Sequence, residues 1–182
     1  MSIWAAIWSA VGFLTYPFYP AMLPKLQKFL EEVFKEILGE DKFTVSLTTA
    51  FEIFRNNLTA SVLAVAFGIF LGLAPLLAVA MNFFIIGFLL SVFVFSGQAH
   101  YFFLAIAPHG ILELPAVLVA SALGLRLGFF WRRPPEGRSA GKNLAIILKQ
   151  ILCVLPLVAL LLFLAALAEV FVTGNLVESI IK

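Results

Sequence analysis

Charged residues are scarce in this sequence, and long stretches contain none. Only 12% of the 182 residues are Asp, Glu, Lys or Arg, against about 25% in soluble domains. Hydrophobic residues make up 63% of the chain. This balance excludes a soluble enzyme and a disordered chain. A nucleic-acid binder is also excluded, because the net charge is only +2 and the basic residues form no stripe. An integral protein of the lipid bilayer remains.

Cysteine is almost absent, and the common catalytic motifs are missing as well. Cys153 is the single cysteine, which excludes an intrachain disulfide and a cysteine-based metal site. The sequence contains no HExxH, no GxSxG and no phosphate-binding loop. Enzymatic activity is therefore poorly supported, and we expect no catalytic residue, no cofactor and no metal.

The gaps between charges predict where the chain crosses the membrane. No charge occurs in residues 1–24, 56–112, 114–125 or 150–168, and a spanning helix needs about 20 apolar residues. We expect an all-α, polytopic transmembrane bundle that forms one membrane domain over residues 1–182, with about five spanning helices. Its parts are a first span at 1–23, a core at 47–131, a basic loop at 132–142 and a last span at 143–173.

The longest gap holds two spans, at about 58–73 and 76–95, and leaves an apolar remainder that is too short for a third. Pro108 and Gly110 interrupt this remainder. We therefore predict a re-entrant segment at 97–112, with irregular backbone around Pro108, His109 and Gly110. A further span follows at about 111–130.

The segment 24–42 has a different pattern, because its apolar residues recur with the period of an α-helix on one face only. It predicts an interfacial amphipathic helix that either lies on the membrane or contacts another subunit. The loop at 132–142 is rich in Arg and Lys, which favours the cytoplasmic side. Counting crossings from this loop predicts N-inside and C-outside.

A few polar side chains interrupt the apolar stretches, and intramembrane polar groups usually have a function or a partner. His109 and Glu113 are four residues apart, so a helix that starts at His109 presents both on one face. Glu113 could accept hydrogen bonds that tie helices together, form a substrate or ion site, or take part in binding a metal. The cluster that we predict comprises Asn56, Asn57, Asn82, His109 and Glu113.

Two pairs of glycines have the spacing that allows helices to approach closely. They are Gly68 with Gly72 and Gly124 with Gly128. Packing within one chain and contact between the two chains of a homodimer are both compatible with this spacing.

Several of these motifs occur together in the order that is typical of one family. These features are the stretch 51–57 with its paired asparagines, Gly68 and Gly72, Asn82, Gly87, and the run 108–115 with its PHGxxE pattern. With them the sequence resembles the stage II sporulation protein M family over roughly residues 50–130. The resemblance implies a multi-pass plasma-membrane protein. In spore-forming bacteria it implies a scaffold that works with peptidoglycan-degrading partners during engulfment.

Two functional hypotheses follow from different features. The first is an integral membrane scaffold or assembly protein that recruits or organises partners, with the lipid bilayer, a homodimer contact and a membrane or cell-envelope protein as its expected partners. The second is a small transporter or channel, with an ion or solute site at the broken helix around His109 and Glu113.

Overall fold

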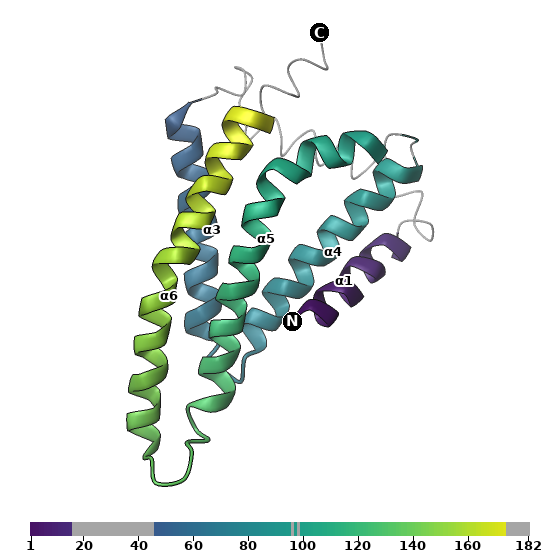
Figure 1. Cartoon of the computed structure of the whole chain (residues 1–182). Helices are drawn as coiled ribbons and strands as arrows, with labels where there is room; N and C mark the ends of the chain where they lie inside the picture. The colour runs from purple at the N-terminus through teal and green to yellow at the C-terminus, as the bar shows by residue number, and fades with distance from the viewer. Residues whose placement is uncertain (16–45, 96, 98, 174–182) are drawn as a thin grey trace.

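The structure is a computed structural model that describes residues 1–15, 46–95, 97 and 99–173. All elements within these ranges are helical, so the prediction of an all-α fold is confirmed there (Figure 1). The expected amphipathic helix at 24–42 and residues 16–23 of the first span lie outside the described residues. The helices are α1 (Ser2–Thr15), α3 (Leu47–Phe67), α4 (Leu73–Phe95), α5 (Ala99–Phe130), α6 (Ala140–Ala168) and the short π-helix η3 (Glu169–Thr173).

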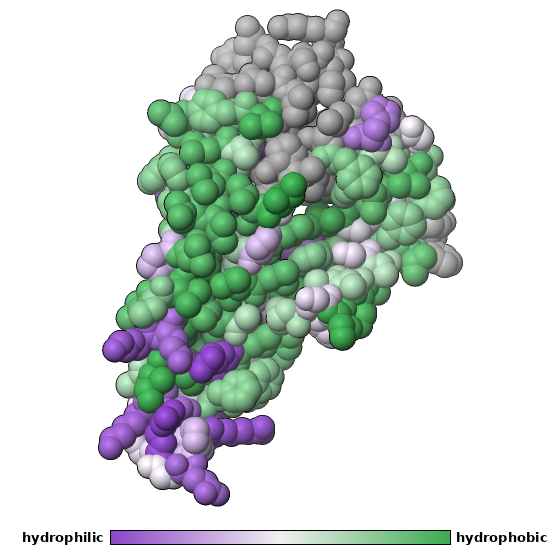
Figure 2. Space-filling model, viewed as in Figure 1, coloured by the Kyte–Doolittle hydropathy of each residue, from purple (hydrophilic) through white to green (hydrophobic). Residues whose placement is uncertain are grey.

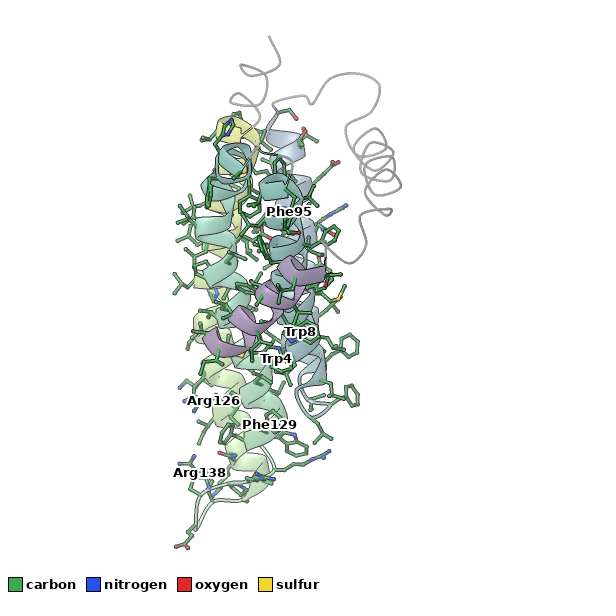
Figure 3. The ribbon with its side chains drawn as sticks, turned by 90° about the vertical axis from the view of Figure 1, so that its right-hand side faces the viewer. Trp4, Trp8, Phe95, Arg126, Phe129 and Arg138 are labelled. Carbon is green, nitrogen blue, oxygen red and sulfur yellow. The ribbon has the colours of Figure 1, made fainter. Side chains whose placement is uncertain are left out.

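The helices form one bundle that consists of two groups. Helix α1 packs on α4, α3 packs with α5 and α6, and contacts between α4 and α5 join the two groups. Helices α3, α5 and α6 run side by side, and α4 inclines away from them (Figure 1). Helix α1 packs on α4 and crosses in front of it when the molecule is turned (Figure 3). Trp4 Nε1 donates to the Leu76 carbonyl at 3.2 Å, and the Phe13 ring lies 6.1 Å from the Phe95 ring. These contacts show that α1 and α4 run parallel.

Three helices are long and apolar enough to cross a membrane: Leu73–Phe95, Gly110–Phe130 and Ala140–Val172. The α4 candidate has 23 residues, or about 34 Å of helix, which exceeds the hydrocarbon thickness of about 30 Å. Helix α1 is apolar but shorter, with 14 residues. Hydrophobic side chains cover the middle of the molecule, and hydrophilic ones gather at the end that carries the loop between α5 and α6 (Figure 2). This pattern is that of a membrane protein.

Helix α5 is continuous where the sequence predicted a break. Residues 108–110 are helical, whereas the sequence led us to expect irregular backbone there. The helix bends instead: its first part lies across one end of the bundle before the rest turns down alongside α6 (Figure 1). Proline cannot donate the backbone hydrogen bond and crowds the preceding turn, so Pro108 accounts for a bend in this region without ending the helix.

The apolar core lies between α3, α5 and α6. Its members are mostly aliphatic, and Val158 and Leu162 are fully buried. Because lipid is as apolar as these side chains, close packing contributes more to helix association here than removal from water does. The buried cluster contains Val65, Ala116, Ala120, Leu127, Ile147, Ile151, Val158 and Leu162.

Glycines bring α3 and its following turn against α5 without intervening side chains. A Cβ built on Gly68 would lie 2.6 Å from the Cα of Gly124, and one built on Gly128 would lie 2.5 Å from the nitrogen of Gly72. The two glycine pairs therefore face each other within one chain. A homodimer contact through the same glycines would need surfaces that this chain already occupies.

The turn between α3 and α4 requires a second property of glycine. Gly72 has a φ of 69°, and its neighbour Leu71 has a φ of 58°. This left-handed region is open to glycine at little cost and is rare for a branched residue such as Leu. A side chain at Gly72 would also meet Leu125 Cδ2 at 2.7 Å. The turn therefore packs closely against α5.

The loop between α5 and α6 is held by Asn143, which is only 6% exposed. Its Nδ2 donates to the carbonyl of Phe130, the last residue of α5, at 2.7 Å and to that of Trp131, the next residue, at 3.3 Å. Carbonyls at the end of a helix have no partner within it. Ser139 caps α6 by accepting from the Lys142 amide. The two helices are therefore joined as a rigid antiparallel hairpin.

Candidate functional site

Polar side chains from three helices line a small, partly open cavity between α3, α4 and α5. The cavity measures about 70 Å³, which is room for a few water molecules and too little for most organic solutes. Helix α3 contributes Asn57 and Ser61, α4 contributes Asn82, and α5 contributes Glu113 and Ser121. The remaining lining is aliphatic and consists of Ala60, Ala64, Ala78, Val117 and Ala120.

Helical spacing places these side chains on faces that meet. Asn57 and Ser61 are four residues apart on α3, and Glu113 and Ser121 are eight apart on α5 with Val117 between them. Residues at these spacings lie on the same side of a helix. The glycine contacts between α3 and α5 hold the two faces close to each other. The local sequence therefore sets which residues face the cavity, and the glycines set its width.

The polar side chains that line the cavity differ in whether they form hydrogen bonds. Asn82 Nδ2 donates to the carbonyl of Ala78, one turn earlier in α4, at 2.8 Å. The side chain of Ser121 is 1% exposed, and its hydroxyl has no hydrogen-bond partner in the part of the chain that the structure describes. Buried hydroxyls usually have such a partner. Ser121 therefore offers an unused donor and acceptor to whatever occupies the cavity.

Three of the five predicted cluster residues line this cavity together: Asn57, Asn82 and Glu113. Asn56 is exposed and does not line it. The backbone of His109 belongs to α5, but its side chain is outside the part that the structure describes. The expected pairing of His109 with Glu113 therefore stays a prediction.

Two residues of the lining, Ser61 and Ser121, are not among those predicted from the sequence. Serine is common in helices, so neither stands out alone. The available signal was their spacing: Ser61 lies one turn after Asn57, and Ser121 lies two turns after Glu113. A search for polar residues on the same helical face as the predicted cluster finds both.

The cavity lining can bind water or a small cation and has few of the groups that hold transition metals. Its five polar side chains present carboxylate, carboxamide and hydroxyl oxygens. Within the described residues, no group of three or more His, Cys, Asp or Glu side chains is placed to hold a metal ion.

Comparison with known proteins gives one family and one distant relative. The profile of the family described as stage II sporulation protein M matches residues 1–174. An uncharacterized protein of Methanocaldococcus jannaschii, MJ0706, is 33% identical over 99 residues, which are 54% of this chain and 40% of that protein. The chain thus spans less than half the length of that relative. No solved structure matches this chain.

The family profile covers nearly the whole chain, including the glycine pairs and all the polar side chains that line the cavity. The resemblance found in residues 50–130 is therefore confirmed and extends to both sides of that region. The chain belongs to the stage II sporulation protein M family.

Proposed function

We propose that the protein is a multi-pass scaffold of the plasma membrane that recruits or organises partner proteins. The observation that carries this proposal is the backbone contact between the glycine pairs of α3 and α5, represented by Gly68 against Gly124. Such contacts leave little freedom for helices to slide or separate. The cavity beside them is small, about 70 Å³, well below the size of typical solute-binding sites. A bundle of this kind suits a fixed platform better than a solute pathway.

The proposed topology places both the N-terminus and the loop between α5 and α6 on the cytoplasmic side. Arg132, Arg133 and Arg138 lie in or beside that loop, which agrees with the positive-inside rule. Because α1 runs parallel to α4, the N-terminus lies on the same side as the start of α4. Two crossings, by α4 and α5, then return the chain to that side at the loop. In this arrangement the first part of α5 is the proposed re-entrant or interfacial element at the opposite boundary, and the bundle makes about five crossings.

The proposed partners are the lipid bilayer and a membrane or cell-envelope protein. The cytoplasmic hairpin end offers charge and apolar surface together: the Arg132 guanidinium lies 4.7 Å from the Trp131 ring centroid, and Phe130 is 59% exposed. Exposed aromatic and arginine side chains are typical of protein contact surfaces. A second copy of the chain remains a proposed partner, through a surface other than the glycine pairs.

Site-specific photocrosslinking in cells of the source organism tests the scaffold proposal. A crosslinking residue at Arg133 should give adducts with a defined set of membrane or envelope proteins. The control is the same residue at Leu152, a lipid-facing position on α6 that is 68% exposed, and it should give none of those adducts. Identical adducts from both positions, or none from Arg133 and from other exposed hairpin positions, would contradict the proposal.

A second candidate function, a small transporter or channel, is favoured by the position of the cavity. Asn82 lies near the middle of the α4 candidate span, and Glu113 lies at the start of the α5 candidate span. Intramembrane carboxylates often mark ion pathways. Flux measurements in liposomes separate the two functions, because only a transporter gives flux that Glu113→Gln abolishes.

A further inference from the structure

We propose that the cavity between α3, α4 and α5 binds one small monovalent metal cation of the Na⁺ type, coordinated by side-chain oxygens. The ligands are Asn57, Ser61, Asn82, Glu113 and Ser121. This proposal does not rest on the scaffold function, because a bound cation can stabilise a platform as well as occupy a transport site. Binding is also measurable without flux.

The ligand set is the first argument, and it points to a hard cation. All five polar side chains of the lining can present oxygen: two carboxamides, two hydroxyls and one carboxylate. Oxygen ligands suit alkali and alkaline-earth cations, whereas transition metals prefer imidazole or thiolate. The described lining contains no lysine or arginine that would repel a cation.

Charge is the second argument, and it selects a monovalent ion. Glu113 is the single acidic side chain of the described lining. One carboxylate balances the charge of one monovalent cation, whereas a divalent cation requires further acidic ligands. Calcium sites usually supply several carboxylates for this reason.

Size is the third argument. A volume of about 70 Å³ accommodates a bare metal ion with one or two waters that complete its coordination. Choline carries the same charge, but its methyl groups keep oxygen ligands away from the charged nitrogen. The cavity should therefore discriminate between metal cations and a bulky organic cation of the same charge, which provides a control salt for the experiment.

Ser121 is the fourth argument, because its burial is otherwise unexplained. A 1% exposed hydroxyl with no hydrogen-bond partner among the described residues carries a desolvation cost. A cation or a water bound to that cation would satisfy the oxygen.

Thermal unfolding of the purified full-length protein in detergent tests the proposal. The protein is exchanged into choline chloride, and NaCl, KCl or LiCl then replaces choline at constant ionic strength. A saturable rise in melting temperature is expected with at least one alkali metal, about 5–10 °C at a hundredfold excess over the dissociation constant. The same melting temperature in all four salts would overturn the proposal. So would a rise with MgCl₂ or CaCl₂ alone, or a cavity that holds only water.

Variants assign the rise to the cavity. Ser121→Ala and Glu113→Gln should lose most of the salt-specific rise, while Asn56→Ala and Glu52→Gln, which alter an exposed asparagine and an exposed acid outside the lining, should keep it. In choline, Ser121→Ala should melt at or above the wild-type temperature, because it removes an unpartnered hydroxyl. A full salt-specific rise in both cavity variants would overturn the assignment.

Discussion

Gly68 and Gly124 meet so closely that a Cβ on Gly68 would lie 2.6 Å from the Cα of Gly124. Real Cβ atoms essentially never approach another heavy atom to under 3.0 Å, so any side chain at this point must push two helix backbones apart. The same contact sets the spacing of the faces of α3 and α5 that line the polar cavity. Fold and candidate site therefore depend on one interface.

Gly68→Ala and Gly124→Ala should each destabilise the protein by about 2 kcal/mol or more, since overpacking a close contact costs about 1–3 kcal/mol and backbone moves less readily than a side chain. Gly141→Ala is the matched control. A Cβ there meets nothing within 4 Å, and alanine favours the helix. Thermal unfolding in detergent should show lowered midpoints for the first two variants only. Equal midpoints for all three would show that the contact between α3 and α5 is looser than described.

A second close contact should control the attachment of α1. A Cβ on Gly87 would meet the Ser9 carbonyl, and one on Gly12 would meet that of Phe84. Gly87→Leu is expected to displace α1 from α4. Trp4 and Trp8 are two of the three tryptophans of the chain, and their rings lie at this interface, 5.7 Å apart. Intrinsic fluorescence should therefore shift in Gly87→Leu and stay unchanged in Ile85→Leu, an exposed position on α4.

Asn143 should contribute more to the stability of the protein than its position beside a loop indicates. Asn143→Ala removes the hydrogen bonds from a buried carboxamide to the carbonyls of Phe130 and Trp131. Within the described part of the chain, the Phe130 carbonyl then keeps only the Arg133 amide as a donor. The expected loss is about 1–3 kcal/mol in the free energy of unfolding. Lys142→Ala, one residue earlier and exposed, should change stability by less than about 0.5 kcal/mol. Similar losses in the two variants would mean that Asn143 is not what joins α5 to α6.

Packing in the core of α6 can be separated from contact with lipid on the same helix. Leu162 is fully buried and Leu160 is 53% exposed. Leu162→Ala should cost about 2–5 kcal/mol, because it leaves a cavity among close-packed side chains. Leu160→Ala, which faces lipid, should cost much less. Unfolding midpoints in one detergent make the comparison, and a larger effect at Leu160 would contradict the arrangement of α6.

Much of the helical pattern could be predicted from hydropathy alone. The predicted span 76–95 falls inside α4, and the predicted span 111–130 nearly coincides with the α5 candidate span at Gly110–Phe130. The prediction of irregular backbone around Pro108 was wrong, because α5 bends there and remains helical. Proline weakens a helix without dictating whether neighbouring helices will hold it together.

The candidate site was harder to predict than the spans. Asn57, Asn82 and Glu113 stood out because polar groups are rare in apolar stretches, and the structure places all three around one cavity. Asn56 is adjacent in sequence to Asn57 but turns outward, since successive helical residues face different directions. Which glycine pair meets which could not be predicted either, because that pairing is a long-range property of the bundle.

Cation flux through the purified protein in liposomes decides between the scaffold and the transporter. In the scaffold, the glycine contacts lock the bundle, and the polar cavity can hold an ion without conducting it. Radioactive sodium uptake into vesicles that contain the wild-type protein should therefore equal uptake into empty vesicles, with and without a pH gradient. Saturable uptake by the wild type that Glu113→Gln abolishes and Glu52→Gln preserves would contradict the scaffold proposal and establish a transporter.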